Sequence, residues 1–359
     1  MFSVRLLNTS GSVVQEFDSW RSLNYSRELN DVGEITFSIN DSSISDLFTL
    51  DSLIEIYQQA IPGSWRKEET FFHRTSQHQL TERDTPIFTS YGKSANDLLR
   101  RRIIAYYATT AFTLKSDAVE TVLKEFVEEN LGPSALVANG RLMPGVFPGF
   151  SVARDLGRGG TWNGQRSYKN LLDVIKEIAE SIGIDYDVKR TTDSNFEFEC
   201  YYPQYGTDRS SYLTFSTGFG NMATPSYTYS RTEEITQVLV LGGDQETSRK
   251  NIYRQSSAIS DSPWNIIEDT VSNNQEDGGA PSLVRMRQTG DDKLEELKAK
   301  ESFQFEVLQT DKWRYGRDYF LGDLVNARFN DIERTMKIIR VDVTVSEGKE
   351  SISLEFKTV

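Results

Sequence analysis

The sequence predicts an α+β fold that is mainly β. The 359 residues include 20 phenylalanines and 16 tyrosines but only five methionines, and aromatic residues favour strands. Short segments of alternating apolar and polar residues, bounded by Gly, Pro and Asn, recur along the chain, which is typical of antiparallel strands. Apolar spacing of 3.6 residues is confined to a few segments. The 37% hydrophobic content indicates a folded chain with a sizeable core.

The N-terminal residues 1–105 are expected to form a β domain, which the C-terminal strands complete. Residues 1–17 predict a hairpin that turns at Asn8 to Ser12, because Asn, Gly and Ser favour tight turns. Further strands are expected where apolar residues alternate with polar ones. They run over 35–39, 53–58, 70–77 and 86–91. Short connections between them indicate a meander or a small barrel.

Helices are expected at three places. Ser94 is placed to cap a helix that runs to about Arg102, because a Ser side chain accepts hydrogen bonds from free backbone N–H groups. A second helix is expected to open at Ser116 and Asp117 and to stop at Gly132-Pro133. The strongest helical stripe follows Ser167 and ends at Gly183.

Residues 106–166 therefore comprise a helix followed by an arm that is rich in Gly and Pro. Eight of the 24 glycines and three of the nine prolines lie within 132–166, where no helical or strand period is visible. A long segment of this kind is usually functional or disordered, but its apolar residues argue against disorder. We expect an extended arm that packs on its own chain or on a neighbour, with Trp162 as its main contact.

Residues 167–245 are expected to combine this last helix with an antiparallel sheet. Phe196 to Gly243 contains four short strands separated by turn signals. Cys200 lies on the apolar side of the first of these strands. We expect it to be a small core residue, because a free Cys is usually buried. The stretch carries no catalytic signature and is interpreted as a scaffold.

Residues 246–359 are expected to form an acidic connection followed by C-terminal strands. A loop over 273–279 and a short charged helix over 291–300 precede strands at 303–308 and 324–329. The chain ends in a hairpin, in which apolar residues alternate over 339–345 and again over 352–356.

The charge of the chain limits its partners. Forty Lys and Arg against 53 Asp and Glu give a formal net charge of −13, which argues against wrapping nucleic acid, because that requires clustered cations. The same charge suits a surface past which DNA slides without sticking. No apolar run reaches the roughly 18 residues of a membrane span, and the N-terminus lacks the features of a signal peptide. A soluble protein made in the cytoplasm is expected.

Enzymatic chemistry, metals and cofactors are not predicted. The two histidines, His73 and His78, would point to opposite faces of a strand and are expected at surface or edge positions. Gly157 to Gly160 neither follows an apolar strand nor opens a helix, as a phosphate-binding loop requires. Glu197 and Glu199 are expected on a solvated strand face. We predict neither a catalytic residue nor a cofactor or metal site.

Several short motifs follow one another over nearly the whole chain. They are Gly33 to Phe37, Ser94 to Ile104, Arg166 to Ala179, Tyr202-Pro203, Gly206 to Arg209, Phe219 to Asn221, Pro225 to Tyr227, Leu241 to Gly243 and Leu321 to Val325. Their order resembles one family, the hub-like tail proteins of long-tailed siphophages. This family is similar in fold to the baseplate hub of contractile-tailed phages.

The resemblance implies a structural virion protein at the tail tip. Such hubs form a ring, usually of three subunits, at the distal end of the tail tube. Two tube-like antiparallel β-barrel or sandwich domains of each subunit build a pseudo-sixfold ring, with helices between them. The expected partners are further copies of the chain, the distal tail or tube protein, the tape measure, and fibre or receptor-binding proteins. The tail would be assembled in the host cytoplasm, and DNA would pass the lumen at genome ejection.

Two other function classes are open. A tail-associated cell-wall hydrolase would need a carboxylate pair in a cleft, although the chain stops directly after a hairpin and any enzyme is expected on another polypeptide. A carbohydrate- or receptor-binding module would use exposed aromatics, with Trp162, Tyr201 and Tyr205 as candidates, although core or subunit packing is the more common role. Asp208 and Arg209 follow a glycine turn and are expected to brace it or to reach a neighbouring subunit.

Overall fold

The computed structural model describes residues 1–41, 43–82, 84–106, 114–192, 195–242, 250–273, 282–346 and 348–359. Within these ranges the chain forms strands β1 to β21 and helices α1 to α4, joined by turns and short 3-10 segments. The prediction of a mainly β, α+β fold is confirmed. Most of the predicted loop over 273–279 and the turn residue Glu347 lie outside the described ranges.

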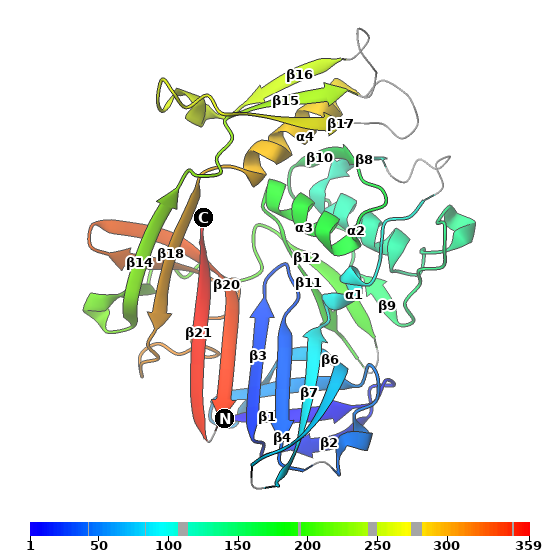
Figure 1. Cartoon of the computed structure of the whole chain (residues 1–359), viewed down its shortest axis with the longest axis vertical. Coiled ribbons are helices and arrows are strands. Elements are labelled where there is room, and N and C mark those ends of the chain that lie inside the picture. Colours follow the sequence, from blue (N-terminus) through cyan, green and yellow to red (C-terminus); the bar gives the residue numbers. More distant parts are fainter. Residues whose placement is uncertain are drawn as a thin grey trace.

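One large sheet joins the two ends of the chain (Figure 1). Its strands follow the order β13-β19-β20-β3-β4-β7-β6-β5-β1-β2, and β21 pairs with β20. The long strand β20 makes the junction, because it pairs with β19 and β21 and also with β3. The strands are β1 (Phe2–Leu7), β2 (Val13–Phe17), β3 (Ser22–Glu28), β4 (Glu34–Ile39), β5 (Leu53–Ile61), β6 (Ser64–Leu80), β7 (Pro86–Ser94), β13 (Thr214–Ser216), β19 (Leu324–Phe329), β20 (Ile332–Ser346) and β21 (Lys349–Thr358).

A two-stranded sheet packs beside the C-terminal part of the large sheet. It consists of β14 (Met222–Ser230) and β18 (Lys300–Val307). Phe305 of β18 stacks on Phe356 of β21 at a centroid distance of 4.4 Å, and Phe215 of β13 lies edge-on to Phe356. These rings belong to the same core cluster as Phe2 and Phe37 near the N-terminus. A single core therefore runs through both terminal β regions.

A second core lies under three helices and two small sheets. The elements are α1 (Asp97–Arg100), α2 (Val119–Asn130), α3 (Leu171–Ile182), β8 (Leu114–Ala118), β9 (Phe150–Val152), β10 (Thr161–Gln165), β11 (Asp185–Arg190) and β12 (Phe196–Tyr201). The apolar stripes of α2 and α3 face this core. Strand β12 pairs with β11 and β9, and β10 pairs with β8. Helices α2 and α3 and strand β12 correspond to predicted elements, but the arm over 132–166, for which no strand was predicted, contains β9 and β10.

Three predicted boundaries differ from the structure. Helix α3 begins at Leu171, because Asn170 and not Ser167 caps it by accepting a hydrogen bond from the N–H of Leu172. Ser94 is the last residue of β7, so the expected first helix is reduced to the short α1. Residues 114–118 form β8 instead of opening α2. In each case a long-range strand pairing or a side-chain cap outweighs local helix signals.

A separate lobe is inserted between β14 and β18. It contains β15 (Gln237–Gly242), β16 (Asn251–Gln255), β17 (Glu268–Asn273) and α4 (Leu283–Glu296). Val238, Val240, Met286 and Leu294 form its small core. Figure 1 shows α4 between the three-stranded sheet and the rest of the molecule. Of the charged helix expected over 291–300, residues 291–296 are the end of the longer α4, whereas Lys300 begins β18. The expected acidic connection contains the strands β16 and β17.

The four strands predicted between Phe196 and Gly243 exist, but they belong to four different sheets. Strand β12 joins β11 and β9, β13 joins the large sheet, β14 pairs with β18, and β15 is the centre of the lobe. Alternation along a strand indicates which face is buried, but it does not indicate the partner strand. The stretch contributes strands to the three core clusters formed by the described residues.

Candidate functional site

Two of the sequence motifs meet in space and form a junction around the buried Asp323. The backbone at Gly206 lies so close to the second motif that a Cβ there would be 2.3 Å from the backbone N of Asp323. The N–H of Thr207 donates to Oδ1 of Asp323 at 2.7 Å, and the N–H of Arg209 donates to the carbonyl of Leu324 at 2.8 Å. The glycine is required here because no side chain fits between the two backbones.

Arg209 fastens this junction from the side. Its Nε lies 2.5 Å from Oδ2 of Asp323, whose carboxylate is almost fully buried. The Arg209 guanidinium also donates to the hydroxyl of Tyr212 at 2.7 Å and lies 5.4 Å from the centre of the Phe320 ring. These contacts show that Arg209 braces the turn within its own chain. It does so through Asp323, which is distant in the sequence.

Asp208 has a different environment from its neighbour. Its Oδ1 accepts hydrogen bonds from the N–H and the hydroxyl of Ser210, and the residue is exposed. These hydrogen bonds lower the pKa of the Asp208 carboxyl. A contact between Asp208 and a neighbouring subunit stays a prediction.

Tyr201 and Tyr205 lie next to each other beside the junction. Their rings meet edge-on at 4.7 Å, and Nζ of Lys189 lies 4.6 Å from the first ring and 5.0 Å from the second. The N–H of Tyr205 donates to Asp185, which forms an ion pair with Lys337 of β20 at 3.0 Å. Both rings are half-buried. The pair links the second core to the large sheet, and its expected role in binding another molecule stays a prediction.

Trp162 lies in β10 and is fully buried within its own chain. Its ring lies edge-on to Phe126 of α2, and the guanidinium of Arg166 lies 5.2 Å from the ring centre. The adjacent Gly164 has the Trp162 ring directly against its Cα, since a Cβ there would lie 2.2 Å from the indole. Trp162 thus packs the arm onto the second core. A role of this residue in assembly stays a prediction.

The Gly/Pro-rich arm is fastened to α2 by a buried ion pair. Arg158 donates to both carboxylate oxygens of Glu120 through its side chain, at 2.8 and 2.9 Å, and its backbone N–H donates at 3.0 Å. Nζ of Lys124 donates to the same carboxylate at 2.7 Å. Burial by itself would raise the pKa of Glu120, but the hydrogen bonds from Arg158 and Lys124 lower it to about 2. The arm therefore packs on its own chain.

Cys200 and one of the two histidines are buried in the protein core. Cys200 is buried, as predicted, and burial raises the pKa of its thiol to about 12. His78 is exposed, but the expectation that His73 lies at the surface is wrong. His73 is buried in β6, where Nδ1 lies 2.6 Å from the hydroxyl of Ser90 and Nε2 lies 3.0 Å from that of Ser76. The two serine hydroxyls give both ring nitrogens a hydrogen-bond partner, which explains how the imidazole can be buried.

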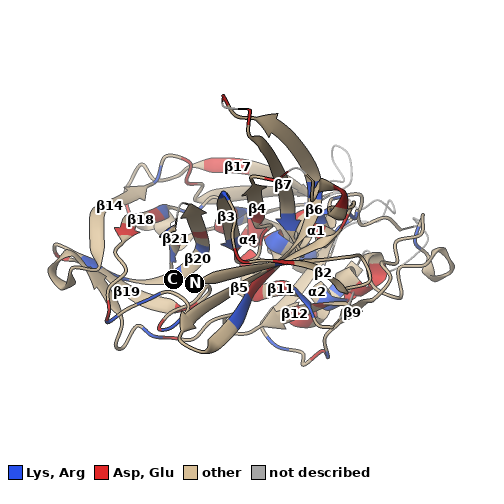
Figure 2. Cartoon of the chain, turned by 90° about the horizontal axis from the view of Figure 1, so that it is seen from below, with Lys and Arg blue, Asp and Glu red and all other residues tan. Residues whose placement is uncertain are grey.

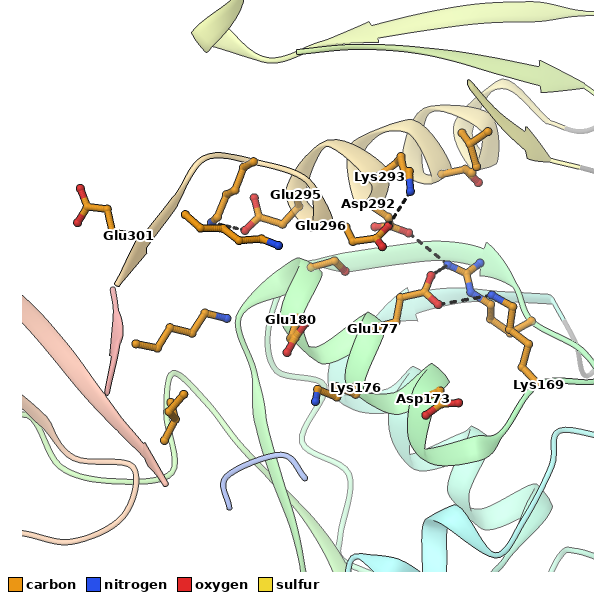
Figure 3. Close-up of a pocket in the computed structure, with 18 of the residues that line it drawn as sticks. Lys169, Asp173, Lys176, Glu177, Glu180, Asp292, Lys293, Glu295, Glu296 and Glu301 are labelled. Carbon is orange, nitrogen blue, oxygen red and sulfur yellow. Dashed lines mark hydrogen bonds and ion pairs between the residues drawn. The ribbon is translucent and has the colours of Figure 1, made fainter. Parts of the chain in front are cut away.

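A charged cleft of about 1060 Å³ lies between α3, α4 and strands β18 and β21 (Figure 3). Charges of both signs line it. The acidic residues are Asp173, Glu177, Glu180, Asp292, Glu295, Glu296, Glu301 and Glu355, and the basic residues are Arg166, Lys169, Lys176, Lys293, Lys298, Lys300 and Lys357. Sequence spacing did not indicate this cleft, because its walls come from segments that are far apart in the chain.

Arg166 links the two walls of the cleft. Figure 3 shows Glu177 of α3 and Asp292 of α4 directed towards one another. Nη2 of Arg166 contacts Glu177 and lies 3.4 Å from Oδ2 of Asp292. Burial raises the pKa of Asp292. Most carboxylates here have a cation nearby, and among the described residues no group of three or more His, Cys, Asp or Glu is placed to hold a metal ion.

Two further observations concern partners of the chain. In the part of the chain that the structure describes, no helix is both long enough and apolar enough to cross a membrane. Figure 2 shows basic and acidic residues interspersed along the elements. A nucleic-acid interface would instead gather cations on one surface.

Comparison with solved structures shows that the fold is that of phage tail proteins. The 43 kDa tail protein of prophage MuSo2 from Shewanella oneidensis has a TM-score of 0.58 and 9% identity, covering 99% of this chain and 98% of that chain. The tail protein from Neisseria meningitidis has a TM-score of 0.56 and 13% identity, with 99% and 96% covered. Prophage tail protein gp18 from Listeria monocytogenes has a TM-score of 0.54 and 11% identity, with 99% and 94% covered.

A comparison of the sequence with protein-family models identifies the family. The family model of the Siphovirus ReqiPepy6 Gp37-like proteins matches residues 3–356. The chain belongs to this family. No curated protein matches it. The resemblance to siphophage tail proteins that the motif order indicated is confirmed.

Proposed function

We propose that this chain is a structural hub of the phage tail tip or baseplate. In this proposal, three copies form a ring at the distal end of the tail tube and connect the tube to host-recognition components. The observation that carries it is the match over the whole length of the chain to the fold of three prophage tail proteins, together with the family membership. A fold by itself does not define a function, so the proposal rests on the shared fold and the shared family together.

The arrangement of the β regions supports a ring component. Both terminal regions share one core and one sheet, so the two β regions of a subunit form a single rigid piece. Two tube-like domains per subunit would give six such units in a ring of three. In this assembly the net charge of −13 keeps DNA from binding the lumen during genome ejection, because carboxylates repel phosphates.

The proposal assigns no catalytic role to the chain. It places the protein in the virion tail, assembled in the host cytoplasm, with the distal tail or tube protein, the tape measure and fibre or receptor-binding proteins as partners. The charged cleft between α3 and α4 is the place where a carboxylate pair could act, but its acids are mixed with cations, which favours structural ion pairs over general acid catalysis.

The mass of the purified protein tests the ring. We expect light scattering and native mass spectrometry to give three times the 40.9 kDa of one chain, and electron micrographs of the particle to place the protein at the tail tip. A monomer at micromolar concentration that also fails to bind tail proteins would overturn the proposal. Clearing of peptidoglycan in a zymogram by this chain alone would favour the hydrolase, and specific binding on a glycan array would favour the carbohydrate-binding module.

A further inference from the structure

The lobe of β15, β16, β17 and α4 has a core of its own. Val238, Val240, Met286 and Leu294 form it, and among the described residues neither of the other two core clusters contains a residue of the lobe. Figure 1 shows α4 facing the helices of the second core, but the apolar side chains of α4 are not part of that core. Folded units that share no apolar core can move relative to one another.

Two short segments connect the lobe to the rest of the chain. The chain enters the lobe over residues 231–236, after β14, and leaves it over 297–299, before β18. The N–H of Ile235 donates to the carbonyl of Leu297 at 2.8 Å, which joins the two segments. Hinges usually lie at the ends of regular elements, because a change in a few backbone angles there moves a whole unit. The joined segments are placed to act as a hinge of the lobe.

The charged cleft of about 1060 Å³ lies next to this hinge. Its walls are α3 and α4, and β18 lines it where the chain leaves the lobe. A cleft of this size means that α3 and α4 are not packed against each other along their whole length. Few contacts therefore fix the position of the lobe.

Most ion pairs around the cleft stay within one wall. Lys169 pairs with Glu177 at 3.7 Å on the side of α3, and the lysine of α4 pairs with acidic residues of the lobe. Among the ion pairs between described residues, one joins α4 to a segment outside the lobe. It is the pair in which Nη2 of Arg166 lies 3.4 Å from Oδ2 of Asp292.

Arg166 lies between two carboxylates that face each other. Glu177 of α3 and Asp292 of α4 point towards one another in Figure 3, and Arg166 contacts both. The side chains of Arg166 and Asp292 are only 12% and 10% exposed, so water screens their charges little. Burial raises the pKa of Asp292, the charge of Glu177 acts in the same direction, and the charge of Arg166 opposes both. Without the guanidinium, the two carboxylates would repel each other across the cleft.

We propose that the lobe is a hinged lid that closes the charged cleft, and that Arg166 is the latch that holds it closed. When the lobe turns away, Arg166 keeps Glu177 as its partner, and Asp292 keeps the hydrogen bond from Nε2 of Gln288 in its own helix. Neither charge is left alone, so opening is reversible. This inference goes beyond the proposed hub and does not depend on a ring, because the lobe is not part of the core that the terminal β regions share.

The distance between two spin labels on the full chain tests the lid. Thr270→Cys in the lobe and Ser351→Cys in β21 provide two exposed thiols, whereas the native Cys200 is fully buried. The labelled protein is mixed with an excess of unlabelled chain, so that double electron–electron resonance reports distances within one copy, in a monomer and in a ring alike. We expect one predominant distance, that of the closed lobe.

Arg166→Gln should open the lid, because it removes the cation between the two carboxylates. We expect the ratio of open to closed lobe to rise about tenfold to a hundredfold, since one partner of a largely buried ion pair is lost. Adding Glu177→Gln should return most of the lobe to the closed position, because one of the two facing charges is then gone. Arg254→Gln is the matched control. Its ion pair with Asp291 of α4 stays within the lobe, so the distance should not change.

Circular dichroism and thermal unfolding must show that the variants are folded. Arg166 also lies over the ring of Trp162. If Arg166→Gln does not fold, Asp292→Lys tests the same contact from the side of the lobe, where two cations would repel, and the same opening is expected.

Three results would overturn the latch. They are an unchanged distance in the folded latch variant, equal opening in Arg254→Gln, and a lobe that stays open when Glu177→Gln is added. None of them bears on the ring, which the mass of the unlabelled protein decides. A failure of the lid and a failure of the proposed function are therefore distinguishable.

Discussion

Nε of Arg209 lies 2.5 Å from Oδ2 of Asp323, and this ion pair joins two turns that are far apart in the sequence. Around it, the backbones of Gly206 and Asp323 are in contact, and Asp323 accepts a further hydrogen bond from the N–H of Phe320 at 2.9 Å. The two turns belong to two of the motifs whose order resembles that of siphophage tail proteins. Their function in this chain is to hold the loop after β12 against the start of β19.

Replacement of Asp323 should therefore destabilise the fold. Asp323→Ala removes hydrogen bonds from Thr207, Phe320 and Arg209 to a buried carboxylate. We expect a loss of about 3 kcal/mol in the free energy of unfolding, because donors that lose a buried charged partner stay unsatisfied. Urea unfolding followed by fluorescence measures it. Asp208→Ala is the control, since that residue is exposed and its carboxylate accepts hydrogen bonds from Ser210, and an equal loss in both variants would contradict the assignment.

A methyl group at Gly206 should have a similar effect for a steric reason. A Cβ there would lie 2.3 Å from both the backbone N of Asp323 and the carbonyl carbon of Gly322. We expect Gly206→Ala to cost about 3 kcal/mol, since rigid backbone has to move. In Gly218→Ala the nearest atom is 3.5 Å away, so its stability should stay near that of the wild type. Thermal unfolding of the pair decides the point, and equal midpoints would count against the close approach.

Removal of the charge of Glu120 should release the arm. Glu120→Gln leaves Lys124, which is buried, without its anionic partner, and we expect a loss of about 3 kcal/mol at pH 7. Limited proteolysis should then cut near Arg158 in the variant before it cuts the wild type. Resistance equal to that of the wild type would show that the ion pair does not hold the arm.

The same carboxyl predicts a dependence of stability on pH. The pKa of Glu120 is lowered to about 2 in the folded chain from a usual 4.5. Because the unfolded state takes up the proton first, the stabilisation is complete above about pH 4.5 and is lost as the pH falls towards 2. Unfolding free energies measured across this range should fall less steeply in Glu120→Gln than in the wild type. Parallel profiles would contradict the prediction.

Trp162→Ala should test core packing and assembly separately. The indole is fully buried between Phe126 and Arg166, so we expect the variant to lose about 3 to 5 kcal/mol of stability. Stability and mass are measured on the same sample. Wild-type stability combined with a smaller mass would favour a direct subunit contact, whereas lost stability with an unchanged mass would remove the assembly role.

Cys200 should report global unfolding. Its thiol is buried and has a pKa of about 12, so little thiolate is present at pH 8 and access is blocked. We expect its reaction with a disulfide reagent to follow the denaturant dependence of unfolding measured by fluorescence. Rapid reaction in the absence of denaturant would show that β12 opens locally.

The sequence by itself determined the local features of this protein. Period-two alternation predicted the strands around Phe37, Phe198 and Val343, the apolar stripe predicted α3, and the motif order indicated the family. These features depend on residues that are neighbours in the chain. The burial of Cys200 was also predictable, since it occupies an apolar position in a regular strand.

Only the tertiary structure decided which segments meet. The four strands after Phe196 joined four sheets, Trp162 entered the core of its own chain, and His73 found two serine partners. The pairing of Arg209 with Asp323 arose in the same way. The physical reason is that alternation fixes which side of a strand is apolar, whereas the partner depends on how distant parts of the chain pack together.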